Sequence, residues 1–199
     1  MENFLRGLIL CFCMFSSMLN AQEKNPEDQQ KISIQPALLV IDVQNDYLPY
    51  MSEGDKKSAM DTINLAISFF HEKRLPVIRI YHQSSDRGPQ PGSAGFEFPK
   101  SVLVSESDPR VIKHYQDAFT KTCLDSLLKE LKVNTVFLCG LSATGCVLGT
   151  YFGALDHDYR ALMIREALIS PKTEQTKMIR DICTSMKYET LMAMLSRKP

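Results

Sequence analysis

Four continuous apolar runs alternate with helix-like stretches along this chain, and this alternation constrains the fold more than any other feature. The runs are ALLVIDV (37–43), PVIRIYH (76–82), NTVFLCG (134–140) and RALMIRE (160–166). A run that is apolar at consecutive positions is typical of a strand buried on both faces. Between the first two runs, residues 57–74 place apolar side chains at helical spacing. Buried strands that alternate with helices predict a parallel sheet covered on both faces.

Weaker signals complete the expected order of elements. They are a short strand at 110–113, helices at 122–132, 146–156 and 172–186, and a closing strand at 190–194. Residues 84–96 are rich in glycine, proline and serine and predict a long loop, a kind of segment that is often functional. In parallel α/β sheets, ligands bind beyond the carboxyl ends of the strands. The residues that follow the strands are therefore the first candidates for chemistry.

The first 21 residues have the layout of a secretory signal peptide. A basic residue precedes an apolar stretch from Leu8 to Leu19, and small or polar residues follow up to Ala21. The stretch is shorter than the roughly 20 apolar residues of a membrane span, so a retained anchor is the less favoured alternative. Residues 22–35 are polar and aperiodic, as in a tether, and residues 36–199 suffice for one domain. We expect an exported protein, periplasmic or extracellular, with no membrane attachment after signal cleavage.

Charge and cysteine content argue against several classes of function. Basic and acidic residues number 23 each, and no basic block stands out. Nothing therefore indicates a nucleic-acid partner or an anionic membrane surface. The cysteines after the expected signal peptide are irregularly spaced, and no CxxC pair suggests zinc. These cysteines are Cys123, Cys139, Cys146 and Cys183.

The strand at 134–140 runs into a turn, FLCGLSATGCVLGT (137–150), in which Cys146 stands where a helix should begin. The turn has the glycine spacing of a phosphate-binding loop, but Cys146 and Val147 replace the required lysine and hydroxyl residues. No dinucleotide fingerprint follows any strand. In a first helical turn, free backbone N–H groups and the helix dipole favour a thiolate and can bind an oxyanion. We therefore expect a lowered pKa for Cys146 and alkylation of its thiol ahead of the other cysteines.

Polar residues lie at or just beyond the ends of three of the expected strands: Asp42, Lys113 and Cys146. Each one alone has an ordinary structural explanation, as a turn residue, a solvated lysine or a small buried thiol. Together at one edge of a sheet they supply a nucleophile, a cation that favours its ionised form, and a carboxylate that can move a proton to a leaving amine. A cysteine–histidine dyad that uses His82 or His114 is the alternative at this edge.

Three segments of the chain, spanning about residues 37–169, resemble the isochorismatase-like cysteine hydrolases, which include nicotinamidases and N-carbamoylsarcosine amidohydrolase. The segments are ALLVIDVQNDYLP, VIKHYQDAFTKTCLDSLL and NTVFLCGLSATGCVLGTYFGAL. The resemblance implies an α/β fold of three α/β/α layers with a six-stranded, mostly parallel sheet. It also implies that Asp42 is the general acid and base, Lys113 the charge partner and Cys146 the nucleophile, with no cofactor.

The same resemblance implies the reaction and the surroundings of the nucleophile. A small amide or ureide would form a thioester with Cys146 and release an amine or ammonia, and water would then hydrolyse the thioester. A non-proline cis peptide between Leu141 and Ser142 would aim the Ser142 and Cys146 amides at one oxyanion. The residues expected by position to line the substrate pocket are Tyr47, His82 and Phe119.

Departures from the family pattern narrow the expectation. Nicotinamidases hold a metal with an Asp-x-His pair and a second histidine after the second strand, and His82 and Asp86 do not reproduce that pattern, so we predict no metal. Members that cleave the vinyl ether of isochorismate lack the cysteine, so Cys146 favours amide hydrolysis over that alternative. Asp117, which replaces a usual serine or asparagine, adds a negative charge near the expected pocket. The expected partner is a small-molecule amide, and a homo-oligomer and a non-catalytic binding module remain open.

Overall fold

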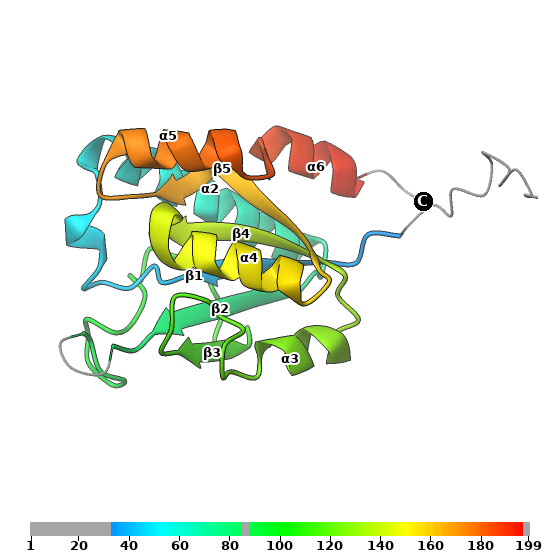
Figure 1. The fold of residues 1–199 in the computed structure, drawn as a ribbon, viewed down its shortest axis with the longest axis horizontal. Helices are drawn as coiled ribbons and strands as arrows, with labels where there is room; N and C mark the ends of the chain where they lie inside the picture. The colour runs from blue at the N-terminus through cyan, green and yellow to red at the C-terminus, as the bar shows by residue number, and fades with distance from the viewer. Residues whose placement is uncertain (1–32, 85–87, 197–199) are drawn as a thin grey trace, which may run out of the picture. The chain divides into compact units, whose positions relative to one another are not determined.

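The computed structural model describes residues 33–84 and 88–196. The expected signal peptide (1–21) and most of the expected tether (22–35) lie outside these ranges, so export stays a prediction. The described residues form one all-parallel sheet with the strand order β3-β2-β1-β4-β5-β6 (Figure 1). The strands are β1 (Pro36–Ile41), β2 (Val77–His82), β3 (Arg110–Lys113), β4 (Thr135–Leu141), β5 (Arg160–Ile169) and β6 (Ser185–Met186).

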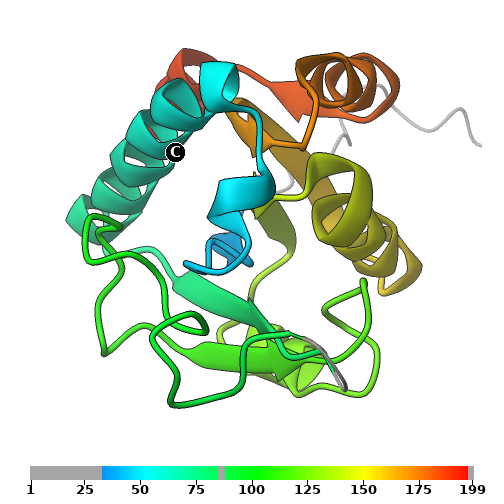
Figure 2. The same ribbon diagram turned by 90° about the vertical axis from the view of Figure 1, so that its left-hand side faces the viewer.

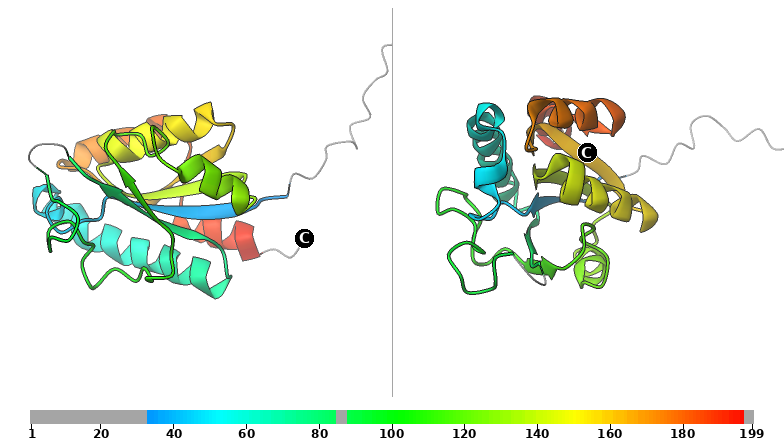
Figure 3. Two further views of the ribbon diagram at one scale, coloured as in Figure 1. Left: turned by 90° about the horizontal axis from the view of Figure 1, so that it is seen from below. Right: turned by 60° about the vertical axis from the view of Figure 1, so that its left-hand side comes forward.

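Helices cover both faces of the sheet, which confirms the expected three-layer α/β/α fold (Figures 2 and 3). The helices are α2 (Glu53–Glu72), α3 (Leu124–Glu130), α4 (Leu148–Asp156), α5 (Thr173–Ile182) and α6 (Tyr188–Ser196). Residues of α2 and α6 share one core cluster, and residues of α3, α4 and α5 share the other. Alternate residues of β1, such as Leu38 and Leu39, enter opposite clusters. This is why the strand is apolar at every position.

The C-terminal segment differs from the sequence-based expectation. The helix predicted at 172–186 ends at Ile182, the last strand is the short β6, and residues 190–194 belong to α6 and not to a strand. Tyr188 and Leu191 are buried against α2 and the sheet, and Leu195 packs on the same cluster. This spacing is helical, and leucine, methionine and alanine are strong helix formers. No helix in the described part of the chain is long and apolar enough to cross a membrane.

A glycine brings β4 into close contact with β1 just before the site. Gly140 has φ +114, and a Cβ atom built on it would lie 2.1 Å from the Ile41 carbonyl oxygen. The register between β4 and β5 also shifts between Leu138 and Gly140. Only glycine combines this backbone conformation with so close an approach.

Changing Gly140→Ala should therefore lower the free energy of unfolding by about 3 kcal/mol or more, because backbone strain and the clash with Ile41 add together. Urea denaturation followed by circular dichroism measures this difference. Gly54→Ala in α2 is the matched control, because its nearest contact would be 3.9 Å away, and it should leave stability within about 1 kcal/mol. Equal stability of the two variants would contradict the proposed close approach.

Candidate active site

Asp42 is the first residue after β1 and is held in a left-handed turn. Its φ is 54, its N–H donates to the Ile80 carbonyl oxygen at 3.0 Å, and its own carbonyl accepts from the Gln44 N–H at 2.7 Å. Aspartate tolerates this backbone conformation better than most residues. Ile41 pairs with Ile80 of β2 and with Gly140 of β4. The Asp42 side chain therefore lies at the carboxyl edge of the sheet, near the ends of both neighbouring strands, and is only 2 % exposed.

Lys113 ends β3 and is completely buried, so the structure rules out a solvated surface lysine. Its Nζ lies 2.8 Å from Asp42 Oδ2 and 3.1 Å from His82 Nδ1, and it donates to the Tyr115 carbonyl oxygen at 3.2 Å. An ammonium group has three protons to donate, and each has a partner here. His82 and Lys113 are direct register partners on β2 and β3. The sheet therefore sets the position of the ammonium group.

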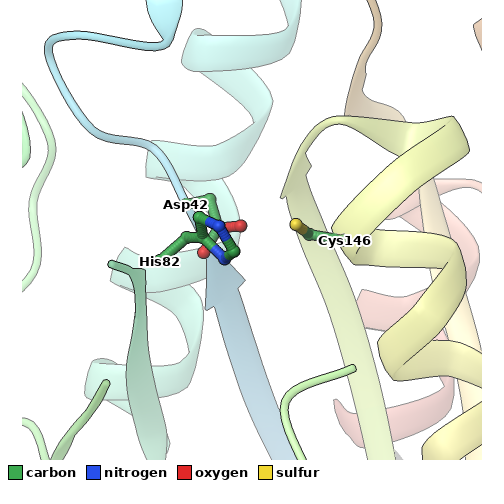
Figure 4. Close-up of side chains that lie close together, drawn as sticks. All are labelled: Asp42, His82 and Cys146. Carbon is green, nitrogen blue, oxygen red and sulfur yellow. The ribbon is translucent and has the colours of Figure 1, made fainter. Parts of the chain in front are cut away.

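Cys146 lies in a π-helical turn, η3 (Ala143–Val147), that leads from β4 into α4. The helix expected to start at Cys146 becomes α-helical only at Leu148. Figure 4 shows the Cys146 sulfur pointing toward Asp42 and His82. One ligand-type atom from each of these three side chains lies within 4.8 Å of the other two. The structure thus brings the expected nucleophile and the expected acid and base together.

One oxygen of the Asp42 carboxylate has no hydrogen-bond partner, and the carboxylate lies close to the Cys146 thiol. Its Oδ2 is paired with Lys113, whereas Oδ1 is buried and makes no hydrogen bond to any described residue. A buried acceptor without a partner is costly and calls for an explanation. The nearby thiol of Cys146 supplies one, because its proton can move to Oδ1.

The pKa of the Cys146 thiol is raised, whereas the sequence predicted that it would be lowered. Burial of the thiol and the negative charge of Asp42 raise its pKa to about 12, although Lys113 acts in the lowering direction. The resting site therefore holds a neutral thiol beside a carboxylate, not a thiolate. The raised pKa instead predicts that Cys146 is not alkylated ahead of the other cysteines. Cys123, which is exposed, should react with iodoacetamide faster than Cys146 at neutral pH.

The backbone N–H groups of Ser142 and Cys146 belong to residues that line the site. The peptide bond between Leu141 and Ser142 is cis, as the family resemblance implied. The Ser142 N–H makes no backbone hydrogen bond within the described residues, and the Cys146 N–H makes none to a described residue outside its own turn. Two such donors are suited to an oxyanion that forms on a substrate bonded to the sulfur.

A cavity of about 190 Å³ opens over these groups. Its lining residues are Asp42, Tyr47, Tyr50, Met51, His82, Leu141, Ser142 and Cys146. Tyr47 and His82 therefore lie where the sequence placed them. Tyr50 and Met51 were not anticipated, although they closely follow the first strand motif in the sequence. Burial and the charge of Asp42 raise the pKa of Tyr47 to about 12, so its phenol stays neutral at physiological pH.

Two other residues expected near the pocket do not line this cavity. Phe119 stacks on His157 with ring centroids 4.7 Å apart and belongs to the core between the sheet and α4. Asp117 accepts hydrogen bonds from the backbone N–H groups of Phe119 and Thr120. Its negative charge therefore stabilises a turn outside the lining of the cavity. The position of Asp117 and Phe119 in the family motif does not reveal these contacts, because local hydrogen bonds set the direction of this segment.

Gln44 is a buried positioning residue that sequence analysis missed. Its side-chain amide donates to the His82 carbonyl oxygen at 3.1 Å and accepts from the His82 N–H at 2.8 Å. The amide thus continues the β1–β2 hydrogen-bond ladder beyond the end of β1. This fixes the backbone of His82 at the cavity wall.

The side chains of Asp42, His82 and Cys146 are also types that bind metals, and they lie close enough to share one ion. The Lys113 ammonium contacts two of the three groups, and its charge opposes a divalent cation at this position. The expected absence of a metal stays a prediction. Asp86 lies outside the described residues.

Residues 36–186 match the isochorismatase domain. The chain belongs to the isochorismatase family. It is 29% identical over 136 residues to the family protein YddQ of Bacillus subtilis, covering 66% of this chain and 76% of that protein. It is 27% identical over 148 residues to a probable inactive nicotinamidase of Arabidopsis thaliana, covering 62% and 74% of the two chains. The N-carbamoylsarcosine amidase of Thermoplasma acidophilum shares the fold, with a TM-score of 0.69, 23% identity, and coverage of 77% of this chain and 96% of that one.

Proposed function

We propose that this isochorismatase-family protein is a hydrolase that cleaves the C–N bond of a small amide or ureide through a thioester at Cys146. The observation that carries the proposal is the free Oδ1 atom of Asp42, buried beside the Cys146 thiol while Oδ2 is paired with Lys113. A proton acceptor, a nucleophile and a fixed cation thus meet at one end of a small cavity.

The first half of the reaction forms the thioester. As the sulfur attacks the substrate carbonyl carbon, the thiol proton moves to Asp42 Oδ1. The carbonyl oxygen becomes an oxyanion, which the Ser142 and Cys146 N–H groups can bind. The intermediate collapses when the C–N bond breaks, and Asp42 gives the proton to the leaving nitrogen. Ammonia or an amine departs, and Asp42 is again a carboxylate.

The second half releases the acid. Asp42 Oδ1 accepts a proton from a water molecule that attacks the thioester. The C–S bond then breaks, and Asp42 returns the proton to the sulfur, which restores both the thiol and the carboxylate. Throughout both halves, one negative charge passes between the carboxylate, the sulfur and the oxyanion. The buried Lys113 ammonium stays close to that charge and has no access to solvent. It therefore stabilises the charge wherever it is located within the site.

The two alternatives fit the site less well. A binding module has no need for a buried carboxylate oxygen left without a hydrogen bond next to a thiol, because each such group reduces stability. Vinyl ether hydrolysis does not require a thiol nucleophile. The relation to a probable inactive nicotinamidase nevertheless makes a direct test of turnover essential.

The test is a panel of small primary amides, ureides and nicotinamide, with ammonia release as the readout. We expect the protein to release ammonia from at least one class of compound, with uncharged substrates favoured because the walls beyond Asp42 are largely aromatic and apolar. Isothermal titration with the same compounds runs in parallel. Binding without ammonia release would replace the hydrolase with a binding module.

A further inference from the structure

Away from the reacting groups, the wall of the cavity offers a substrate few polar atoms. The Ser142 hydroxyl oxygen lies 3.2 Å from the Thr144 hydroxyl oxygen, and the two groups share a hydrogen bond. The Tyr47 hydroxyl oxygen is buried, so a ligand in the cavity meets the Tyr47 ring and not its hydroxyl. Met51 and Leu141 also line the cavity, and their side chains carry no hydrogen-bond donor. This part of the wall therefore suits a hydrocarbon group better than a polar one.

The wall also carries no free positive charge among the described residues. Burial and the Lys113 charge lower the pKa of His82, so its ring is uncharged at neutral pH. Lys113 itself is completely buried, is paired with Asp42 and does not line the cavity. The Asp42 carboxylate is thus the charge that a ligand meets. A second carboxylate on the substrate would lose its water, face Asp42 and find no cation to pair with.

The volume of the cavity limits the size of the group that it can bury. A volume of about 190 Å³ holds about six water-sized groups at about 30 Å³ each, which corresponds to an amide group and a chain of about three carbons. Met51 fixes this volume on one side, because it is only 9 % exposed and packs in the core cluster with α2. Tyr50 also lines the cavity but is 74 % exposed, so little packing holds its ring in place.

We propose that the cavity selects uncharged amides with a compact hydrocarbon acyl group, and that Met51 limits the length of acyl group that the cavity can bury. This preference rests on the proposed hydrolase function and narrows its substrate class. Amides that carry a carboxylate or a second amide on the acyl chain bind poorly, because the walls leave those groups without partners. Longer hydrocarbon chains gain nothing from their extra carbons, because Met51 occupies the space that would bury them.

The selection is measured by NMR titration of the Cys146→Ala protein, which cannot form a thioester and therefore reports binding alone. The ligands are 3-methylbutanamide, propanediamide and 3-amino-3-oxopropanoate, which have the same number of non-hydrogen atoms and differ only at the end of the acyl chain. At pH 7.5 we expect the Kd of the diamide to be about 10-fold higher than that of 3-methylbutanamide, and the Kd of the acid about 100-fold higher or more. Equal Kd values for the acid and 3-methylbutanamide overturn the proposal.

The role of Met51 is measured as the ratio of kcat/KM for hexanamide to kcat/KM for butanamide. In Met51→Ala this ratio should rise about 10-fold, because two more methylene groups can be buried. Met51→Val removes less of the side chain and suits the extended backbone at φ −89 and ψ 153, so it covers the case in which Met51→Ala does not fold. It should raise the ratio about 3-fold. Met163→Ala is the matched control, because Met163 is completely buried in the other core cluster and does not line the cavity. Its ratio should stay within about twofold of the wild-type ratio.

The outcomes separate the substrate preference from the hydrolase function. Ammonia release with the same ratio in wild type, Met51→Ala and Met51→Val overturns the role of Met51 and leaves the hydrolase intact. A ratio that rises equally in Met163→Ala also overturns it, because looser packing of the core would then be the cause. If the wild-type protein releases ammonia from no amide, the hydrolase function falls, and the titrations still decide whether the cavity selects hydrocarbon amides. Circular dichroism of each variant checks that it is folded.

Discussion

Cys146→Ala should reduce amide hydrolysis by about 10⁴-fold or more while the protein stays folded. The Cys146 sulfur lies close to the Asp42 carboxylate and lines the same cavity as Ser142. Without it no thioester forms, and water has no equivalent position from which to attack. Ammonia release from the best panel substrate measures the loss. Thermal unfolding should change by only a few degrees, because the side chain is small and lies at a cavity wall.

Cys123→Ala is the matched control for this experiment. Cys123 is an exposed free thiol that precedes α3 and does not line the cavity. Its removal should leave kcat/KM within about twofold of the wild-type value, since isolated surface substitutions have small effects. More than about 1% of wild-type turnover in Cys146→Ala would contradict the thioester route and return attention to direct attack by water.

The elements of the sheet were predictable because burial on both faces leaves a continuous apolar run. β1, β2 and β4 follow this rule, and each begins and ends within two residues of the predicted run. The segment around Leu191 was ambiguous, because a short apolar run fits a strand and a buried helix face equally. In the structure this segment is the helix α6, which packs against α2.

The site was predictable only in part. The strand ends and the family motifs located Asp42, Lys113 and Cys146, because parallel strands bring their carboxyl ends to one edge. The Gln44–His82 interaction joins residues 38 positions apart through a side chain, and no local pattern predicts such a contact. Phe119 was misplaced for a related reason, because its stacking on His157 depends on the packing of α4.

The direction of the Cys146 pKa shift could not be obtained from the sequence. The helix start and Lys113 are visible in the sequence, and both favour the thiolate. The burial of the sulfur and its distance from Asp42 are set by the fold, and these two effects on the pKa are the largest in the structure. The sequence thus suggests a site that ionises the Cys146 thiol, whereas the folded site holds this thiol protonated at rest. Its activation is coupled to proton transfer to Asp42.

Asp42→Asn should therefore have two opposite effects: hydrolysis should fall by about 10³-fold or more, while the reactivity of Cys146 toward iodoacetamide should rise. Asparagine keeps the shape and tolerates the left-handed backbone at φ 54, but it cannot accept the thiol proton or return it. Loss of the negative charge removes one cause of the raised pKa and leaves the Lys113 charge, which lowers it. Each unit by which the pKa falls gives about tenfold more thiolate at neutral pH.

Mass spectrometry of the alkylated peptides at pH 7.5 measures both the Cys146 rate and the Cys123 rate, with Cys123 as an internal standard. Asp46→Asn is the matched control, because it removes an exposed carboxylate close in sequence that does not line the cavity. It should leave the alkylation rate of Cys146 within about twofold. If the alkylation rate of Cys146 in Asp42→Asn falls together with turnover, Asp42 must favour a thiolate that is already present in the resting enzyme. The neutral thiol and the proton transfer to Asp42 would then both be wrong.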